Sequence, residues 1–121
     1  MRLSRLKKAI EKSWNRDTCH YKFLWDETEL PPSAGHCRVV SLIVQDYYGG
    51  DIMHTHVKGN PKWDHYYNRI KGRIIDLTHD QFPARTKFVK PEKVSREEAL
   101  ASKRTQKGYE LLKRRVKRQL E

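Results

Sequence analysis

The sequence predicts a single-domain α+β protein in which a small antiparallel sheet is flanked by helices. Apolar residues recur at helical spacing near both ends of the chain, and a compact apolar run stands between them, followed by strand-like segments joined at Lys71-Gly72. With 121 residues, of which 36% are hydrophobic, the chain is long enough for one core and too short for two. We expect one domain over residues 1–121, made of an N-terminal helix (1–16), a helix plus sheet (33–83) and a basic C-terminal helix (95–120).

The first expected element is an amphipathic helix over residues 3–15. Its apolar residues recur every three or four positions and therefore share one helical face: Leu3, Leu6, Ile10 and Trp14. This pattern breaks between residues 17 and 33, and Pro31-Pro32 predicts a stiff, extended entry into the next element.

The second expected element is a helix over residues 36–48. Its centre is the apolar run Val39–Val44, and Gly49-Gly50 supplies the residue type that accepts a left-handed cap at a helix end. The β-branched residues of the run would also suit a strand. The length of the run and its lack of period-two alternation favour the helix. Cys37 then lies on the first helical turn.

Strands are expected over residues 51–57, 65–70 and 73–78, the last two forming a hairpin around Lys71-Gly72. In a two-residue loop Ile70 faces Arg73, so His65 and Asp76 become diagonal neighbours on one face. A three-residue loop would place the two side chains on opposite faces. The two-residue register therefore predicts contact between the imidazole and the carboxylate.

The last third of the sequence predicts one long helix. Thr78–Gln81 resembles a capping box, but Pro83 limits any helix there to a short turn, and residues 84–94 are basic and irregular in pattern. Ser95 and Glu98 form a better capping box, which predicts a helix over residues 96–119. The apolar positions assigned to it are Leu100, Tyr109, Leu112, Val116 and Leu120.

The chain is strongly basic, with a net charge of +11, and the excess is concentrated at its C-terminal end. Residues 84–121 hold 13 Lys and Arg against 5 Asp and Glu. A surface of this kind attracts nucleic acid, an anionic polymer or an acidic protein, although a basic solvated helix would give the same composition. We therefore expect an acidic protein or nucleic acid as a candidate partner of the C-terminal helix.

Neither a signal peptide nor a membrane span is expected. The first 14 residues alternate basic and apolar side chains, and no apolar stretch approaches the roughly 18 residues that a membrane span needs. We expect a cytoplasmic protein without a membrane partner. In that reducing compartment Cys19 and Cys37, the two cysteines of the chain, are expected to be free thiols.

A cysteine nucleophile needs a base beside it and a third group that orients the base. Cys37 at a helix start, where free N–H groups favour a thiolate, together with His65 and Asp76 on the hairpin, matches these requirements. We expect these three as a catalytic triad, with the Cys37 N–H as one oxyanion donor. The alternative for Cys37 is a small buried hydrophobe.

Four further residues have side chains suited to an oxyanion hole or to orienting a substrate: His36, Gln45, Asn68 and Gln81. His36 stands next to the nucleophile, but it would also suit an exposed helix start. Gln45 falls two turns after Cys37 and would also cap the helix end. Asn68 points away from His65 if the strand is regular.

A metal site is the competing chemistry. His54-Thr55-His56 places two imidazoles on the same side of a strand, with His65, Asp64 or Asp76 as a third ligand. A His-x-His pair alone carries little specificity, and strand-end histidines explain it equally well. We expect neither a metal nor another cofactor.

The ordered motifs of the chain resemble those of the YunG-like family of small bacterial and phage proteins. The residues that carry this resemblance are Ser13-Trp14, Thr18, Gly35-His36-Cys37, Ser41–Tyr47, Gly49-Gly50, His65–Arg69, Gly72, Asp76–Thr78, Gln81-Phe82, Tyr109 and Leu111-Leu112. The family is similar in layout to papain-like, transglutaminase-like and NlpC-type cysteine enzymes. The resemblance implies a papain-like core with Cys37 as nucleophile, His65 as base and Asp76 as orienter. The family commonly has a glutamine where this chain has His36.

The sequence thus predicts a cysteine hydrolase of the peptidase or amidase type acting on a peptide or protein. The alternative is a non-catalytic protein of the same fold, such as a phage-encoded inhibitor or a nucleic-acid binder that uses the basic C-terminal helix. Reactivity of Cys37 that depends on His65 would favour the enzyme. Salt-sensitive binding to nucleic acid would favour the alternative.

Overall fold

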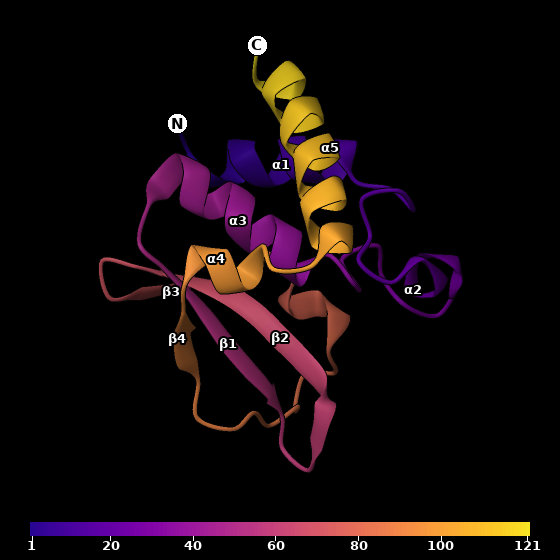
Figure 1. Cartoon of the computed structure of the whole chain (residues 1–121), viewed down its shortest axis with the longest axis vertical. Coiled ribbons are helices and arrows are strands. Elements are labelled where there is room, and N and C mark those ends of the chain that lie inside the picture. The colour runs from indigo at the N-terminus through magenta and orange to yellow at the C-terminus, as the bar shows by residue number, and fades with distance from the viewer.

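A computed structural model describes all 121 residues and confirms the α+β class (Figure 1). A four-stranded antiparallel sheet has the strand order β3-β2-β1-β4, and α3 packs against strands β1 and β2. The helices α1 and α5 lie on the far side of α3 from the sheet (Figure 1). The element bounds are α1 Leu3–Ser13, α2 Lys22–Asp26, α3 Cys37–Tyr48, β1 Asp51–Val57, β2 Asn60–Ile70, β3 Arg73–Ile75, β4 Glu92–Val94, α4 Arg96–Ala99 and α5 Lys103–Leu120, with a single 3-10 turn at His79–Gln81.

The centre of the fold is α3, because the run Val39–Val44 is buried on every side of the helix. One side of α3 meets the sheet and another meets α5, so apolar residues all round the helix are covered. Gly49 ends the helix with φ +70°, a conformation that glycine adopts without the strain of a Cβ. The predicted helix over 36–48 is therefore confirmed to within one residue.

The hairpin between β2 and β3 has the predicted two-residue turn. Ile70 pairs with Arg73 and Asn68 with Ile75, which is the register expected from Lys71-Gly72. The strand bounds differ, since β2 begins at Asn60, before the predicted start at 65, and β3 ends at Ile75, before the predicted end at 78. Pairing of His56 with Asp64 and of Val57 with Asn60 extends β2 to positions before the predicted start.

The long C-terminal helix predicted over residues 96–119 is wrong in its continuity. The chain forms a short α4, leaves the helical path at Leu100, and begins α5 at Lys103. Two serines cap the two helices in the same way: Ser95 Oγ accepts the Glu98 N–H and Ser102 Oγ accepts the Thr105 N–H, each at 3.1 Å. The second capping serine, Ser102, therefore starts a new helix inside the segment that was predicted to be a single helix.

Two further elements arise where the sequence indicated irregular structure. The short helix α2 lies within the segment 17–33, and β4 lies within 84–94. In β4 the pairing of Ile52 with Val94 adds an edge strand to β1. Both elements are five residues or shorter, so neither carries a hydrophobic period long enough to be recognised in the sequence.

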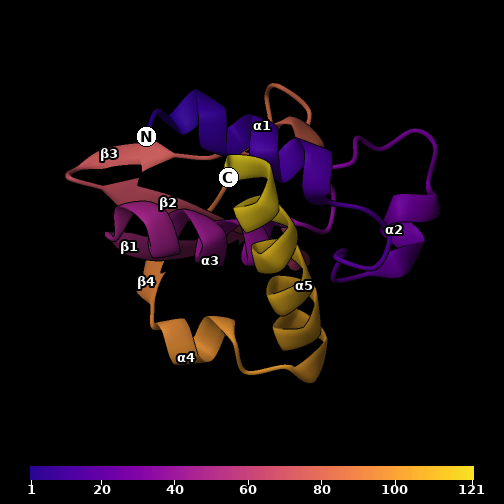
Figure 2. The same cartoon turned by 90° about the horizontal axis from the view of Figure 1, so that it is seen from above.

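The two terminal helices are in contact, because α1 packs across α5 (Figures 1 and 2). Leu6 and Ile10 of α1 are buried together with Leu112 and Val116 of α5 in the central core cluster. The outer faces of both helices carry most of their charged residues. None of the helices combines the length and apolar character that crossing a membrane requires.

Gly108 in the middle of α5 allows a close approach between α5 and the loop after α1. A Cβ at this position would lie 2.8 Å from the carbonyl oxygen of Thr18 and 3.6 Å from Val39 Cγ1. The first of these distances is shorter than real side chains tolerate. The glycine that weakens the isolated helix is therefore needed for its packing.

We expect Gly108→Ala to lower the free energy of unfolding by about 1–2 kcal/mol, because the clash with backbone outweighs the gain in helix propensity. Urea unfolding followed by circular dichroism measures the change. Lys117→Ala, an exposed position on the same helix, is the control and should stay within about 0.5 kcal/mol of the unmodified protein. A Gly108→Ala protein as stable as the control would contradict this account.

Candidate active site

Cys37 is the first residue of α3 and is partly exposed. Gly35 precedes it with φ +80°, and a Cβ there would lie 2.5 Å from Cys19 Sγ, so only glycine fits this turn into the helix. No side chain caps α3, and the Cys37 N–H donates to no backbone acceptor. The sulfur and a free N–H donor are thus presented together at the positive end of a helix.

His65 and Asp76 are in direct contact, as the hairpin register predicted. His65 Nε2 lies 2.7 Å from Asp76 Oδ2, and the other carboxylate oxygen of Asp76 accepts the Thr78 N–H at 3.3 Å. The imidazole is 2% exposed and packs edge-on against Phe82 with ring centroids 4.8 Å apart. Since Asp76 occupies Nε2, the ring nitrogen that remains for another partner is Nδ1.

The charge state of His65 depends on Asp76 and Cys37. Burial lowers the pKa of His65, but hydrogen bonds with Asp76 and Cys37 and the negative charges of both outweigh burial and raise it to about 9. The imidazole is therefore protonated at neutral pH. A thiolate at Cys37 is the charge that such an imidazolium stabilises best. Cys37, His65 and Asp76 thus form one interacting group.

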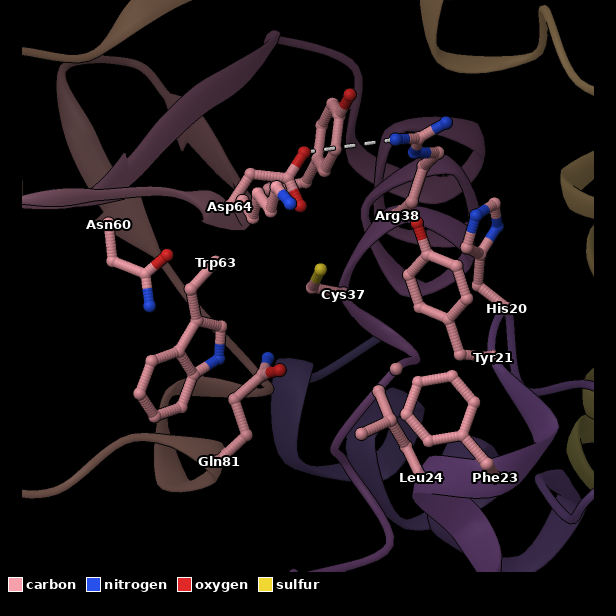
Figure 3. A pocket seen from close by; sticks show the side chains of 13 residues that line it. His20, Tyr21, Phe23, Leu24, Cys37, Arg38, Asn60, Trp63, Asp64 and Gln81 are labelled. Carbon is pink, nitrogen blue, oxygen red and sulfur yellow. Dashed lines mark ion pairs between the residues drawn. The ribbon is translucent and has the colours of Figure 1, made fainter.

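An open cleft of about 260 Å³ lies over Cys37 (Figure 3). One wall is the segment before and within α2, including Tyr21 and Leu24, and the other comes from the start of β2, including Asn60 and Trp63. Figure 3 shows the Cys37 sulfur between these walls, with the Gln81 amide turned toward it. A ligand in the cleft can therefore reach the sulfur.

Gln81 is held beside the three residues. Its Nε2 donates to the Thr78 carbonyl oxygen at 3.0 Å and lies 3.5 Å from His65 Nδ1. The single 3-10 turn that follows Thr78 places this amide between the imidazole and the cleft. Of the four residues expected to orient a substrate, Gln81 is the one that the structure brings to the cleft.

His36 is held away from the cleft, although it precedes Cys37. Its side chain is fully buried and packs between the rings of Trp14 and Trp25. Nδ1 lies 2.7 Å from the Pro32 carbonyl oxygen, which can only accept, so Nδ1 is the protonated nitrogen. Nε2 lies 2.8 Å from Thr18 Oγ1. Burial lowers the pKa of His36 to about 4, so the ring is neutral and offers no oxyanion donor.

Gln45 and Asn68 also have structural partners away from Cys37. Gln45 Nε2 donates to the Gly50 carbonyl oxygen and its Oε1 accepts from Arg96, so it ties the end of α3 to α4. Asn68 Nδ2 donates to the Ser41 carbonyl oxygen at 2.9 Å and thereby joins β2 to the middle of α3. Asn68 faces α3, as strand alternation indicated.

The histidines of β1 do not gather into a metal site. His54 Nε2 lies 2.9 Å from Asp64 Oδ2, whereas His56 Nδ1 contacts the Val57 carbonyl oxygen. No group of three or more His, Cys, Asp or Glu side chains in the structure is arranged to hold a metal ion. Cys19 and Cys37 are both free thiols, as expected.

Several cleft residues were not predicted from the sequence. Tyr21 and Trp63 form opposite walls, and Arg38 lines the cleft next to Cys37. Their segments showed no periodic pattern, and the walls come together only when α2 and the start of β2 lie across the end of α3. The adjacency of Arg38 to the predicted nucleophile was the one available signal.

Comparison with known proteins places the chain in a family. A family model described as YunG protein matches residues 2–121. The chain belongs to the YunG family. An uncharacterized protein YunG of Bacillus subtilis (strain 168) is 39% identical over 82 residues, a match that covers 68% of the chain and 64% of that relative. No solved structure matches the chain.

The two buried histidines of this YunG family member should have pKa values on opposite sides of neutral pH. In an NMR titration of the imidazole C–H signals we expect His65 to stay protonated up to about pH 9 and His36 to stay neutral down to about pH 4.

Asp76→Asn should lower the pKa of His65, because it removes the negative charge that stabilises the imidazolium, and should leave that of His36 unchanged. His56→Ala is the control, since His56 contacts only a neighbouring carbonyl oxygen. A His65 signal that titrates near the ordinary value of 6.5 in the unmodified protein would contradict the assigned contacts.

Proposed function

We propose that this protein is a cysteine hydrolase in which Cys37 is the nucleophile, His65 the acid and base, and Asp76 the group that orients His65. The observation that carries the proposal is the buried His65–Asp76 pair, 2.7 Å apart, whose imidazole also interacts with a cysteine at a helix N-terminus. These are the three roles that nucleophilic acyl transfer requires. The cleft gives an acyl group access to the sulfur.

The arrangement supports a two-step acyl transfer. Cys37 Sγ attacks the acyl carbon, and the oxyanion that forms accepts a hydrogen bond from the Cys37 N–H. His65 passes its Nδ1 proton to the leaving amine or alkoxide as the acyl–heteroatom bond breaks, which leaves a thioester on Cys37. His65 then takes a proton from water, the resulting hydroxide attacks the thioester carbon, and the C–S bond breaks to give a carboxylic acid.

Asp76 keeps the imidazole in the orientation that both steps need. Because its carboxylate accepts from Nε2, Nδ1 is the ring nitrogen that is left to exchange a proton with Cys37 and the leaving group. This layout, a cysteine at a helix start facing a histidine on a strand, is the layout of papain-like and transglutaminase-like enzymes, including the NlpC type. We propose a peptide or protein as the substrate, because the walls of the cleft carry apolar side chains such as Leu24 and Trp63.

The test is the reactivity of Cys37 with iodoacetamide, followed by mass spectrometry. At pH 6 we expect Cys37 to react at least tenfold faster than buried Cys19, because the His65 imidazolium stabilises the thiolate. His65→Ala should slow the reaction at Cys37 about tenfold or more at pH 6. The effect of His65→Ala should fade above pH 9, where His65 itself loses its proton.

Acyl turnover separates an enzyme from a protein with a reactive thiol. Hydrolysis of an activated ester such as p-nitrophenyl acetate should show several turnovers, no activity in Cys37→Ala, and a loss of about 10²-fold in His65→Ala. His56→Ala is the matched control and should keep full activity. Equal labelling of Cys37 in the unmodified protein and in His65→Ala, or ester hydrolysis that survives Cys37→Ala, would rule out this proposal.

Nucleic-acid binding is a second candidate function, favoured by the charge of the packed pair α1 and α5. The residues of α1 include four Lys or Arg and one Glu, and those of α5 include eight and one, so the pair holds +10 of the chain's +11. All of these basic residues except Arg115 are exposed. An 18-residue helix is about 27 Å long and presents its charges as a line, which suits a phosphate backbone.

If this surface binds duplex DNA through four or five phosphates, log K should fall with log salt at a slope of about −4. The double variant Lys107→Glu and Arg114→Glu, on one exposed side of α5, should weaken binding at least tenfold and flatten the slope. Lys58→Glu with Lys90→Glu reverses the same charge on exposed residues outside α1 and α5 and is the control. Equal losses in the two double variants would show that net charge alone attracts DNA. Fluorescence anisotropy measures all three proteins.

A further inference from the structure

Arg38 follows the proposed nucleophile and lines the same cleft (Figure 3). Its side chain is only 20% exposed, and its guanidinium carbon lies 4.6 Å from the centre of the Tyr66 ring. Tyr66 supports the cation through its ring face and takes none of its N–H donors. Arg38 is thereby held in place while its donors remain free for a ligand.

The other partly buried arginines all have hydrogen-bond acceptors. Arg96 donates to Gln45, Asp46 and Tyr109, and Arg115 donates to the Ser13 carbonyl oxygen. Arg38 donates to no acceptor in the structure. None of its guanidinium nitrogens is fully buried, so the N–H groups of Arg38 face the open cleft and stay accessible to a ligand. A ligand in the cleft would supply the missing acceptors.

Asp64 is the acidic residue nearest to Arg38, and it does not satisfy those donors. The Arg38 Nη2 to Asp64 Oδ2 distance is 3.9 Å, too long for a hydrogen bond. The same oxygen lies 2.9 Å from His54 Nε2, so its closer partner is the histidine. Asp64 therefore holds Arg38 in the cleft by charge and leaves the planar fork of N–H groups open.

The rest of the cleft favours an anion flanked by apolar groups. Lys62 adds a second cation to the lining, where Asp64 is the single acidic residue. Three large aromatic side chains on the walls are exposed to solvent: Tyr21 (44%) and Phe23 (67%) on one wall and Trp63 (42%) on the other. Exposed apolar groups gathered in one cleft are typical of a ligand-binding site. The cleft is thus cationic near Cys37 and aromatic along its walls.

We propose that Arg38 is the anion-recognition residue of this cleft, and that the substrate carries a carboxylate close to the acyl carbon that Cys37 attacks. The guanidinium fork matches a carboxylate with two parallel N–H···O bonds. A peptide with an acidic side chain beside the cleaved bond and apolar neighbours fits the whole lining. This inference deepens the proposed function and rests on Cys37 as the reacting group.

Two alkylating reagents of nearly equal size test the proposal at Cys37 itself. Iodoacetate carries a carboxylate and iodoacetamide a neutral amide, so the ratio of their rates at Cys37 reports anion recognition separately from the reactivity of the thiol. In the unmodified protein we expect iodoacetate to react at least tenfold faster than iodoacetamide. Arg38→Gln should reduce this ratio about tenfold, and because both rates are measured on the same protein, the ratio cancels any change in the reactivity of the thiol itself.

Arg104→Gln is the matched control, because Arg104 lies over the Tyr21 ring of the cleft wall and makes no hydrogen bond there. Its ratio should stay within twofold of that of the unmodified protein. A ratio unchanged by Arg38→Gln would overturn anion recognition by Arg38. Because the proposed function is judged by the effect of His65→Ala on the iodoacetamide rate alone, the two proposals fail on different measurements.

A protection experiment needs no variant and so does not depend on how Arg38→Gln folds. The α-amide of N-acetylglutamate, whose side-chain carboxylate is its single charge, should at millimolar concentration slow the labelling of Cys37 by iodoacetamide. The α-amide of N-acetylglutamine carries no charge and should protect severalfold less. Equal protection by both compounds, or by neither, would contradict a carboxylate site in the cleft. Inorganic phosphate at the same concentration separates a carboxylate site from a general anion site and should protect less than the charged amide.

Discussion

The burial of α3 is the constraint on which the rest of the molecule depends. Six consecutive residues, Val39–Val44, are shielded from water by the sheet on one side and by α5 on another. A helix enclosed in this way cannot shift along its axis without disrupting the packing of the core. The positions of both ends of α3 are therefore fixed. One end leads through Gly49 into β1. The other presents Cys37 and a free N–H to the cleft.

His36 and His65 show that burial alone does not determine whether an imidazole is protonated. Both rings are almost completely shielded from water, yet the pKa of His36 is lowered to about 4 and that of His65 is raised to about 9. His36 meets a carbonyl oxygen and a hydroxyl, whereas His65 meets a carboxylate and a thiol. Anionic partners overcome desolvation and neutral ones do not. The first histidine therefore supports the fold, and the second is suited to move protons.

The charges of the molecule divide it into two regions with different properties. The pair α1 and α5 carries nearly the whole net charge on long exposed side chains, where salt screens it. The cleft carries few charges, but Arg38 in its lining and His65, which contacts the cleft residue Gln81, are partly or wholly shielded, so each acts more strongly on a neighbouring group. Attraction of a polyanion by the helices and recognition of one carboxylate in the cleft would thus be separate events.

The sequence alone determined the features that depend on local pattern. These are the helix that starts at Cys37, the two-residue hairpin and, through its register, the meeting of His65 with Asp76. Strand alternation and helical periodicity act between neighbouring residues, so they can be recognised without the fold. The tertiary structure decided the burial of His36 and the free donors of Arg38, because those depend on residues outside the local pattern, such as Thr18 and Tyr66. No spacing rule in the chain encodes such contacts, and they exist only once α2, α3 and the start of β2 have packed together.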